Sequence, residues 1–198
     1  DGINCSLVCS RNRGTAEAFC MKHGAERWCT DLMEAAEAKD VDAVYIASPN
    51  SLHYEQAALM LSHGKHVLCE KTITSNEEEL KELVRIAGEN RAVLMEAMRS
   101  VHEEGFLQLR EVLPMAGTIR RISFQYAKYS SRYDKFKEGI IENAFNPEFS
   151  NGALMDIGVY CVHPLVRLFG MPKKIIADSL LLSNGVEGAG TILASYDG

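Results

Sequence analysis

The chain has 198 residues, of which 46% are hydrophobic and 24% are charged, and its formal net charge is −6. This is the composition of an ordinary globular protein, and it excludes collagen, coiled coil and intrinsic disorder. Lysines and arginines are scattered and no apolar run approaches the roughly 20 residues of a bilayer span, so we expect neither a nucleic acid nor a membrane as partner.

The first half of the chain alternates short β-rich runs with helical patterns. The predicted strands cover 3–9, 43–47, 66–69 and 92–95. The predicted helices cover 15–23, 31–39, 51–63 and 75–87. Two helices open with capping boxes, Asp31 with Glu34 and Ser75 with Glu78. Such alternation predicts right-handed βαβ units around a parallel sheet, and the nearly all-apolar run 43–47 is typical of a strand covered on both faces.

The pattern changes after about residue 99. A helix is predicted over 102–113, an alternating strand over 118–129, an aperiodic stretch over 130–151 and a helix over 153–169. Two strand-like runs, 174–182 and 191–196, flank a Gly-rich turn over 185–190. Long strands without intervening helices favour an antiparallel sheet. We therefore expect an α/β domain over 1–98 and an α+β domain over 99–198 with an open, mainly antiparallel sheet.

The cysteines and the N-terminal residues indicate a reducing, cytoplasmic setting. The six cysteines form no C-x-x-C pair, and four of them lie in apolar runs, where a free thiol behaves as a small buried hydrophobe. The first residues lack the basic head and apolar stretch of a signal peptide. We therefore expect no disulfide framework and no metal site.

A doubly wound nucleotide domain normally opens with a strand and a G-x-G-x-x-G turn, whose glycines admit a pyrophosphate. That motif is absent from the sequence, and Gly185, Gly188 and Gly190 have the wrong spacing for it. We interpret these three glycines as a hairpin turn. The first strand and the glycine loop are therefore expected upstream, with both ends of the chain cut.

Ligands of a parallel sheet bind at the carboxyl ends of its strands. Glu70 and Lys71 follow the strand 66–69, and a lysine beside a positively charged nicotinamide could exchange protons near neutral pH. The alternative is a surface ion pair. The turn after 43–47 supplies candidate cofactor contacts, namely Ser48, Pro49, Asn50 and His53. Helix capping alone would also explain Asn50, and a first-turn surface position would explain His53.

The predicted helix 153–169 carries Asp156, Tyr160 and His163 at i, i+4 and i+7, which places them on one face. An acid, a phenol and an imidazole in line could bind and protonate a hydroxyl or carbonyl group. The alternative is an amphipathic core helix with a hydrogen-bonded histidine. Pro164 is expected to kink this helix.

Three runs occur in a characteristic order: DAVYIASPNSLH (42–53), GKHVLCEK (64–71) and NGALMDIGVYCVH (151–163). Together they resemble the Gfo/Idh/MocA oxidoreductases, in the branch of the dihydrodiol dehydrogenases and glucose-fructose oxidoreductases. The resemblance implies a Rossmann nucleotide domain and hydride transfer between NADP or NAD and a sugar, cyclitol or diol. It also implies a homodimer or homotetramer formed through the open sheet.

The resemblance carries roles over by position. Lys71 and Tyr160 would be catalytic, Asp156 would orient the substrate, and Glu70 would shape the cofactor site. Ser10 and Arg11 would lie by the adenosine ribose, where a basic residue suits a 2′-phosphate and favours NADP. Further candidate substrate contacts are His163, Arg99 and Arg132, the two arginines being equally compatible with solvated surface positions.

One residue departs from the family pattern, since Thr72 stands where the family's E-K-P triplet has proline. Proline would stiffen the turn that holds the lysine, and threonine relaxes that restraint. Thr72 is the only sequence support for one alternative to a dehydrogenase, a non-catalytic dinucleotide-binding sensor or regulatory protein. A second alternative, NAD-dependent glycoside cleavage, lies within the reach of the family that the sequence resembles.

Overall fold

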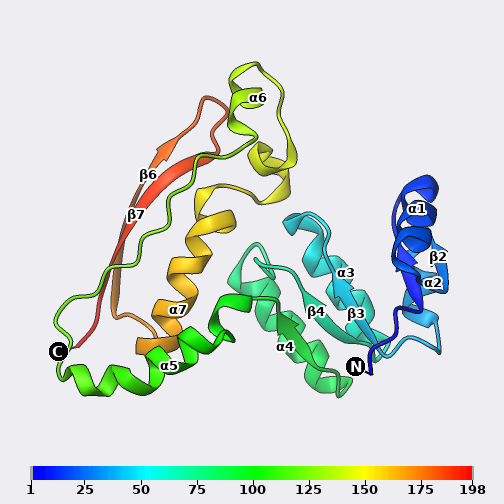
Figure 1. Ribbon diagram of the computed structural model, residues 1–198, viewed down its shortest axis with the longest axis horizontal. Helices are drawn as coiled ribbons and strands as arrows, with labels where there is room; N and C mark the ends of the chain where they lie inside the picture. The colour runs from blue at the N-terminus through cyan, green and yellow to red at the C-terminus, as the bar shows by residue number, and fades with distance from the viewer. Residues whose placement is uncertain (1, 198) are drawn as a thin grey trace. The chain divides into compact units, whose positions relative to one another are not determined.

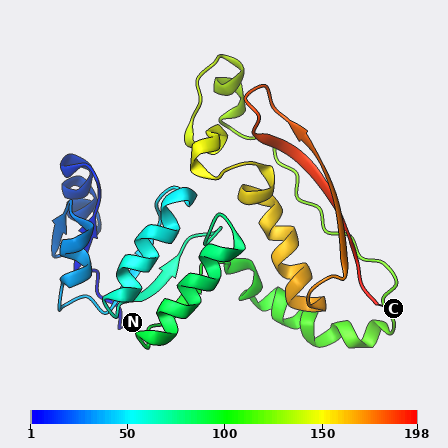
Figure 2. The ribbon, with the colours of Figure 1, turned by 180° about the vertical axis from the view of Figure 1, so that it is seen from behind.

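The computed structural model describes residues 2–197, which divide into two compact units. The first unit comprises Asp1–Ser48 and Leu52–Glu96, and the second comprises Pro49–Ser51 and Ala97–Gly198. Figure 1 colours the elements in chain order, and Figure 2 shows the same ribbon from behind.

The first unit is built from parallel strands and helices, which confirms the predicted α/β fold. Its strands are β1 (Leu7–Cys9), β2 (Arg27–Cys29), β3 (Ala43–Ile46), β4 (His66–Cys69) and β5 (Leu94–Glu96). Its helices are α1 (Arg13–His23), α2 (Leu32–Glu37), α3 (His53–Ser62) and α4 (Glu77–Glu89), and a 3-10 turn over Asn50–Leu52 precedes α3. Strand β1 pairs with β2, and β3, β4 and β5 pair in that order, all in parallel.

The structure corrects three details of this unit. The strand β2 was not predicted, and the parallel strands form two sheets instead of one. The N-cap of α4 is Asn76, one residue after the predicted cap Ser75, because the Asn76 side chain accepts a hydrogen bond from the Glu79 amide at 2.9 Å. The Ser75 amide in turn donates to the Glu79 carboxylate at 2.9 Å. The observed capping interactions therefore involve Ser75, Asn76 and Glu79, whereas the predicted capping box paired Ser75 with Glu78.

The core of the first unit lies on one face of the β3-β4-β5 sheet, where α3 and α4 pack. Leu61 and Leu83 have no exposed surface there, and burying a leucine side chain contributes roughly 1.5–3 kcal/mol. The opposite face is exposed at Tyr45, Leu68 and Met95. The prediction that 43–47 is covered on both faces is therefore wrong for β3, because the described helices of this unit that pack on β3, β4 and β5 all lie on one side.

The second unit combines helices with one antiparallel pair of strands. Its helices are α5 (Glu104–Val112), α6 (Tyr133–Lys137) and α7 (Val159–Phe169), with 3-10 turns over Arg99–Val101, Leu113–Ala116, Asn143–Phe145 and Pro147–Phe149. A π-helical turn, Leu154–Gly158, leads directly into α7. Strands β6 (Lys174–Leu181) and β7 (Glu187–Ser195) pair antiparallel, with Ile176 opposite Leu193.

Two predictions for this unit need correction. The alternating run 118–129 forms no strand within the described residues, because it lacks the backbone ladder to a neighbour that a strand requires. Strand β7 begins at Glu187, so Gly188 and Gly190 lie inside it. A Cβ atom on Gly188 would lie 2.6 Å from Leu182 Cδ2, and one on Gly190 would lie 3.2 Å from the Asp178 carbonyl oxygen. The absence of a side chain at these two glycines therefore lets Leu182 and Asp178 pack closely against β7, and neither glycine lies in the turn.

The hairpin turn itself spans 182–186. The Leu182 amide donates to the Val186 carbonyl at 2.8 Å, and Gly185 adopts φ 84° at the tip. The Asn184 side chain donates to the Phe145 carbonyl at 2.7 Å. The tip of the hairpin is thereby tied to the segment that precedes the π-helical turn.

One helical stretch, Pro147–Phe169, is long and apolar enough, by length and composition alone, to cross a membrane, with a mean hydropathy of 1.3. This corrects the expectation that no stretch approaches that length. A core helix of a water-soluble domain passes the same test, so a single stretch of this kind is weak evidence for a membrane.

Candidate active site

The turn Glu70–Ile73, which follows β4, carries Lys71 and is anchored on both sides. The Glu70 amide donates to the Ile46 carbonyl at the end of β3, at 2.8 Å. The Ile73 amide donates to the Glu96 carboxylate at the end of β5, at 2.9 Å. The backbone on either side of Lys71 is therefore fixed by the two strands that flank β4.

Glu70 is engaged by its neighbours. Its carboxylate accepts a hydrogen bond from the Tyr45 hydroxyl on β3 and a second one from the Lys71 amide at 3.2 Å. The bond to Glu70, with burial as the second cause, raises the pKa of Tyr45 to about 12. Burial, together with the negative charges of Glu96 and Glu70, raises the pKa of the Cys69 thiol to about 12. Glu70 therefore shapes the turn, while Tyr45 and Cys69 stay protonated at neutral pH.

Ser48, at the carboxyl end of β3, provides a test of whether a cofactor fits here. Its hydroxyl is buried and has no hydrogen-bond partner among the described residues. Leaving a buried hydroxyl unsatisfied costs about 1–3 kcal/mol. A ligand group that bonds to this oxygen would remove that cost, so Ser48 fits a bound dinucleotide at the strand end.

Pro49 and Asn50 follow Ser48 but belong to the second unit. The Asn50 side-chain amide donates to the Ser150 carbonyl at 3.2 Å and to the Asn151 side chain at 3.1 Å. Both of these hydrogen bonds hold the segment before the π-helical turn. Its contact with a cofactor stays a prediction.

His53, the first residue of α3, is fully buried, with no exposed surface. Its Nδ1 atom lies 2.8 Å from the Thr72 carbonyl oxygen, and its Nε2 atom lies 2.9 Å from the Ser48 carbonyl oxygen. The interpretation of His53 as a surface residue is therefore wrong. Because both ring nitrogens face backbone carbonyls, the ring has no remaining polar atom to offer a cofactor.

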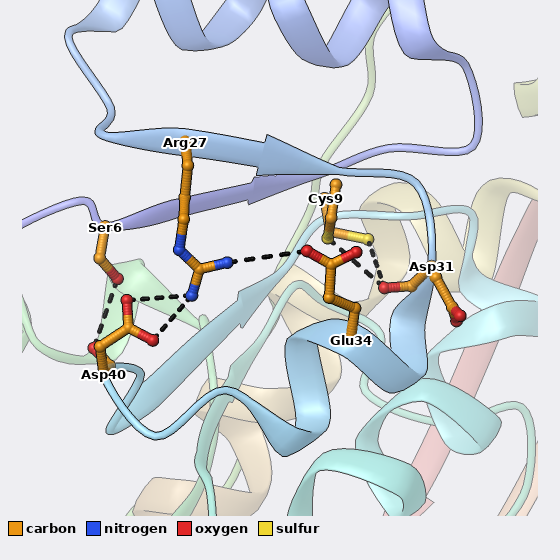
Figure 3. Close-up of polar contacts among 7 residues, drawn as sticks. Ser6, Cys9, Arg27, Asp31, Glu34 and Asp40 are labelled. Atoms are coloured by element: carbon orange, nitrogen blue, oxygen red, sulfur yellow. Dashed lines mark hydrogen bonds and ion pairs between the residues drawn. The ribbon is translucent and has the colours of Figure 1, made fainter.

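Ser10 and Arg11 follow β1, where a network of polar contacts braces the ends of β1 and β2 (Figure 3). Arg27 binds both carboxylate oxygens of Asp40, at 2.7 and 2.9 Å, which holds the pKa of Asp40 below its usual range. The Ser10 amide donates to the Cys29 carbonyl at 3.2 Å. Arg11 is exposed at this carboxyl end of β1, whereas the Arg27–Asp40 pair lies at the amino ends of the two strands.

The Cys9 thiol in the same network carries no charge at neutral pH. Cys9 and Cys29 lie opposite each other on β1 and β2, and both approach the Asp31 carbonyl, at 3.8 and 3.4 Å (Figure 3). Burial, followed by the hydrogen bond to Cys29, raises the pKa of Cys9 to about 12. The pair therefore acts as packing between the strands and α2, where the Asp31 side chain accepts the Met33 amide as the helix cap.

In the second unit, the π-helical turn carries Asp156, and α7 carries Tyr160 and His163. Asp156 is exposed, whereas Tyr160 and His163 are half-buried. The start of this helical segment is fixed to β7, because the Leu154 amide donates to the Glu187 carboxylate at 3.1 Å. The prediction did not include a π-helical turn, which changes the angular spacing on which the shared face of the three residues was based.

The Tyr160 ring stacks on Tyr126, with ring centroids 5.7 Å apart and planes inclined by 25°. Offset stacking of this kind contributes roughly 0.5–1.5 kcal/mol beyond burial. Tyr126 lies in the run 118–129, whose alternation was interpreted only as a strand. No local feature of the sequence predicts that this ring stacks on Tyr160.

The two predicted arginine contacts make ion pairs at the surface. Arg99, whose side chain is 86% exposed, lies 2.6 Å from Glu103, and Arg132 lies 3.4 Å from Glu142. Exposed pairs contribute little to stability, and contact with a substrate stays a prediction for both arginines. Lys71 belongs to the first unit and Tyr160 to the second, so their pairing also stays a prediction.

The second unit contains an open hollow of about 2490 Å³ between α7, the run 118–129 and the β6–β7 pair. Apolar residues of the helical segment line it, among them Leu154, Ile157, Cys161 and Leu165. This volume exceeds the roughly 300–1,000 Å³ of small-molecule pockets. We therefore interpret the hollow as an unfilled space between helix and sheet, and not as a ligand site.

Comparison with known proteins connects this geometry to a family. Residues 1–98 match the model of the Gfo/Idh/MocA oxidoreductase family with an NAD-binding Rossmann fold. The chain is 52% identical to scyllo-inositol 2-dehydrogenase (NADP(+)) IolU of Bacillus subtilis, over 98% of this chain and 59% of that protein. It is 33% identical to trans-1,2-dihydrobenzene-1,2-diol dehydrogenase of Mus musculus, over 96% of this chain and 56% of that protein.

A solved structure of an oxidoreductase has a similar fold. KijD10, a 3-ketoreductase from Actinomadura kijaniata in complex with NADP and TDP-benzene, matches with a TM-score of 0.74 at 25% identity, over 97% of this chain and 62% of that one. The chain thus spans a little more than half the length of the curated relatives that it matches.

Proposed function

This chain belongs to the Gfo/Idh/MocA oxidoreductase family, and from that premise we propose that its protein transfers hydride between NADP or NAD and a CH–OH carbon of a cyclitol, sugar or diol. The observation that carries the proposal is the anchored turn Glu70–Ile73, which presents Lys71 at the carboxyl end of β4. At the carboxyl end of the neighbouring strand β3 lies the buried, unpartnered hydroxyl of Ser48. Strand ends of this kind are where doubly wound folds bind dinucleotides.

In this proposal the first unit holds the cofactor. Ser48 and Lys71 bind at the ends of β3 and β4, and Ser10 with Arg11 binds the adenosine ribose at the end of β1. When bound, the dinucleotide supplies the carbon that accepts or donates the hydride. The exposed guanidinium of Arg11 suits a 2′-phosphate, which supports NADP over NAD.

The second unit supplies the acid/base group and the substrate contacts. In the oxidative direction Tyr160 accepts the proton of the substrate hydroxyl, and in the reductive direction it returns that proton to the carbonyl oxygen. A lysine ammonium near the phenol favours its ionised form, and this is the role proposed for Lys71. Asp156 orients the substrate by accepting a hydrogen bond from a neighbouring hydroxyl, and His163, Arg99 and Arg132 are further candidate contacts.

The substrate class follows from the relatives. One relative at 52% identity is a scyllo-inositol dehydrogenase, and one at 33% is a dihydrodiol dehydrogenase. Both substrates carry vicinal hydroxyl groups on a six-membered ring. We therefore place cyclitols and cyclic diols ahead of linear sugars for this protein.

The strand pair β6–β7 supports the proposal of a homodimer or homotetramer. Successive side chains of a strand alternate between its faces, so one face of the pair exposes Ile176, Leu180 and Leu193, and the opposite face exposes Ile175 and Ile192. Contiguous exposed apolar patches typically mark interaction sites. A cytoplasmic location, predicted from the sequence, stays a prediction.

The experiment that tests the function measures NADP- and NAD-linked turnover of the full protein on a panel of cyclitols, sugars and diols. Lys71→Ala and Tyr160→Phe should each lower kcat by about 10²–10⁴-fold, as expected for loss of proton transfer. Lys81→Ala, which removes an exposed lysine paired with Glu77, is the matched control and should leave kcat unchanged. Undiminished turnover in both site variants would refute the mechanism, and cofactor binding without turnover on any substrate would indicate a sensor.

A further inference from the structure

The two turns that form the proposed cofactor site are joined by one buried side chain. His53 has no exposed surface, and its two ring nitrogens lie 2.8 Å from the Thr72 carbonyl oxygen and 2.9 Å from the Ser48 carbonyl oxygen. Ser48 lies two residues after the end of β3, and Thr72 directly follows Lys71. The ring therefore spans the gap between the two strand ends where the cofactor is proposed to bind.

The backbone ladder between the two strands ends before it reaches these residues. The last paired residues of β3 and β4 are Ile46 and Cys69, and the next backbone bond, from the Glu70 amide to the Ile46 carbonyl, closes the ladder at 2.8 Å. Beyond that point the chains leave the sheet. Both ring nitrogens lie within hydrogen-bond distance of a carbonyl in the region that the sheet itself does not hold. A neutral imidazole donates to only one of the two carbonyls, and the proton on Nδ1 is the one that bonds the Thr72 carbonyl.

We propose that His53 is a positioning residue: by linking the Ser48 and Thr72 carbonyls it sets where Lys71 stands in the active site. The inference rests on the proposed function, because it concerns the residue to which that function assigns the proton-transfer role. Misplacement of a reacting group by about 1 Å can reduce a rate by about 10²-fold. The bond to Thr72, adjacent to Lys71, is the one that should affect catalysis.

Two substitutions separate the two contacts. In asparagine the amide nitrogen is as many bonds from Cβ as Nδ1 is in histidine, so His53→Asn keeps a donor for the Thr72 carbonyl and places no polar atom at the Nε2 position beside Ser48. In glutamine the amide nitrogen corresponds to Nε2, so His53→Gln places a donor beside Ser48 and loses the one for Thr72. Leu61→Ala, at a buried site in the same helix, is the control for general destabilisation.

The first measurement uses the full protein without cofactor. Acetylation of Lys71 by acetic anhydride is followed by mass spectrometry, together with thermal unfolding. His53→Gln should change the Lys71 acetylation rate by about threefold or more and lower kcat by about 10–100-fold. His53→Asn should remain within about twofold of the wild type in both, and Leu61→Ala should lower the melting temperature without changing Lys71 acetylation.

Equal effects of His53→Gln, His53→Asn and Leu61→Ala on Lys71 acetylation would overturn the proposal and reduce His53 to a structural residue. If the His53 variants do not fold, the imidazole ¹⁵N signals of the wild-type protein decide instead. A proton bound to Nδ1 is required for donation to Thr72, and its absence would refute the link. Since neither acetylation nor the nitrogen signals need turnover, failure of the dehydrogenase assay remains distinguishable from failure of this inference.

Discussion

The anchoring of the Lys71 turn by Glu96 makes a quantitative prediction. The Ile73 amide, on a residue that is 8% exposed, donates to the Glu96 carboxylate at 2.9 Å. Glu96→Ala leaves this amide without its charged acceptor, and an unsatisfied buried donor costs about 1–3 kcal/mol. We expect the variant to lower the free energy of unfolding by about 2 kcal/mol. Glu96→Gln, which keeps a carbonyl acceptor, should lower it by less than about 1 kcal/mol.

Urea unfolding followed by circular dichroism measures this difference in the full protein. The matched control is Glu82→Ala, which removes an exposed carboxylate paired with Arg85 at 2.6 Å and should change the free energy of unfolding by at most about 1 kcal/mol. The slope with urea should be the same in all variants, because none changes the surface exposed on unfolding. If Glu96→Ala is as stable as Glu82→Ala, the turn is not held by this bond and the reasoning is wrong.

Three further predictions concern packing, pH and assembly. Gly190→Ala should destabilise the hairpin by about 1–3 kcal/mol, since its Cβ would lie 3.2 Å from the Asp178 carbonyl oxygen. The control is Gly105→Ala, in a helix with open space around it, which should be neutral or stabilising by up to about 1 kcal/mol. Equal losses of stability in thermal unfolding of the two variants would contradict this. Burial and neighbouring charges raise the folded-state pKa of Cys69 from 9.0 to about 12, so the contribution of the neutral thiol to stability is full below pH 9 and is lost as pH rises towards 12. The urea midpoint should therefore decline less above pH 9 in Cys69→Ala than in the wild type. An equal decline in the two proteins would contradict this prediction. Leu193→Lys should shift the protein towards monomers in analytical ultracentrifugation if β6–β7 forms the interface, and an unchanged sedimentation coefficient would exclude that face.

Local signals in the sequence predicted the elements whose ends are set by single residues. Helix α1 is capped by Gly24, and α3 ends two residues before Gly64. These glycines adopt φ 71° and 72°, because glycine enters the left-handed region at little cost. The parallel strands β3 and β4 were also predicted, since their apolar runs are flanked by such turns. Secondary structure of this kind is determined by residues that are close in sequence.

What sequence reasoning missed depends on partners that are distant in the chain. Strand β2 has only three residues, two of them Arg27 and Trp28, and exists through pairing with β1. The run 118–129 has the alternation of a strand but lacks a pairing neighbour among the described residues. An alternating pattern indicates which faces are apolar but not whether a ladder forms.

The candidate site divides in the same way. The positions of Ser48 and Lys71 at strand ends followed from the chain order. The roles of His53, Glu96 and Tyr126 did not, because each depends on a contact with a residue well separated in sequence. A histidine in the first turn of a helix has no local feature that tells a buried bridge from a surface group.

The hairpin between β6 and β7 has a consequence for how this chain can diverge. Asn184 at its tip holds the Phe145 carbonyl, and Glu187 at the start of β7 holds the Leu154 amide. The hairpin and the loop that leads to Asp156 are thus fastened at two points. Among homologues, an insertion in one of these two segments should be accompanied by a length change in the other, because the two hydrogen bonds fix the distance between them.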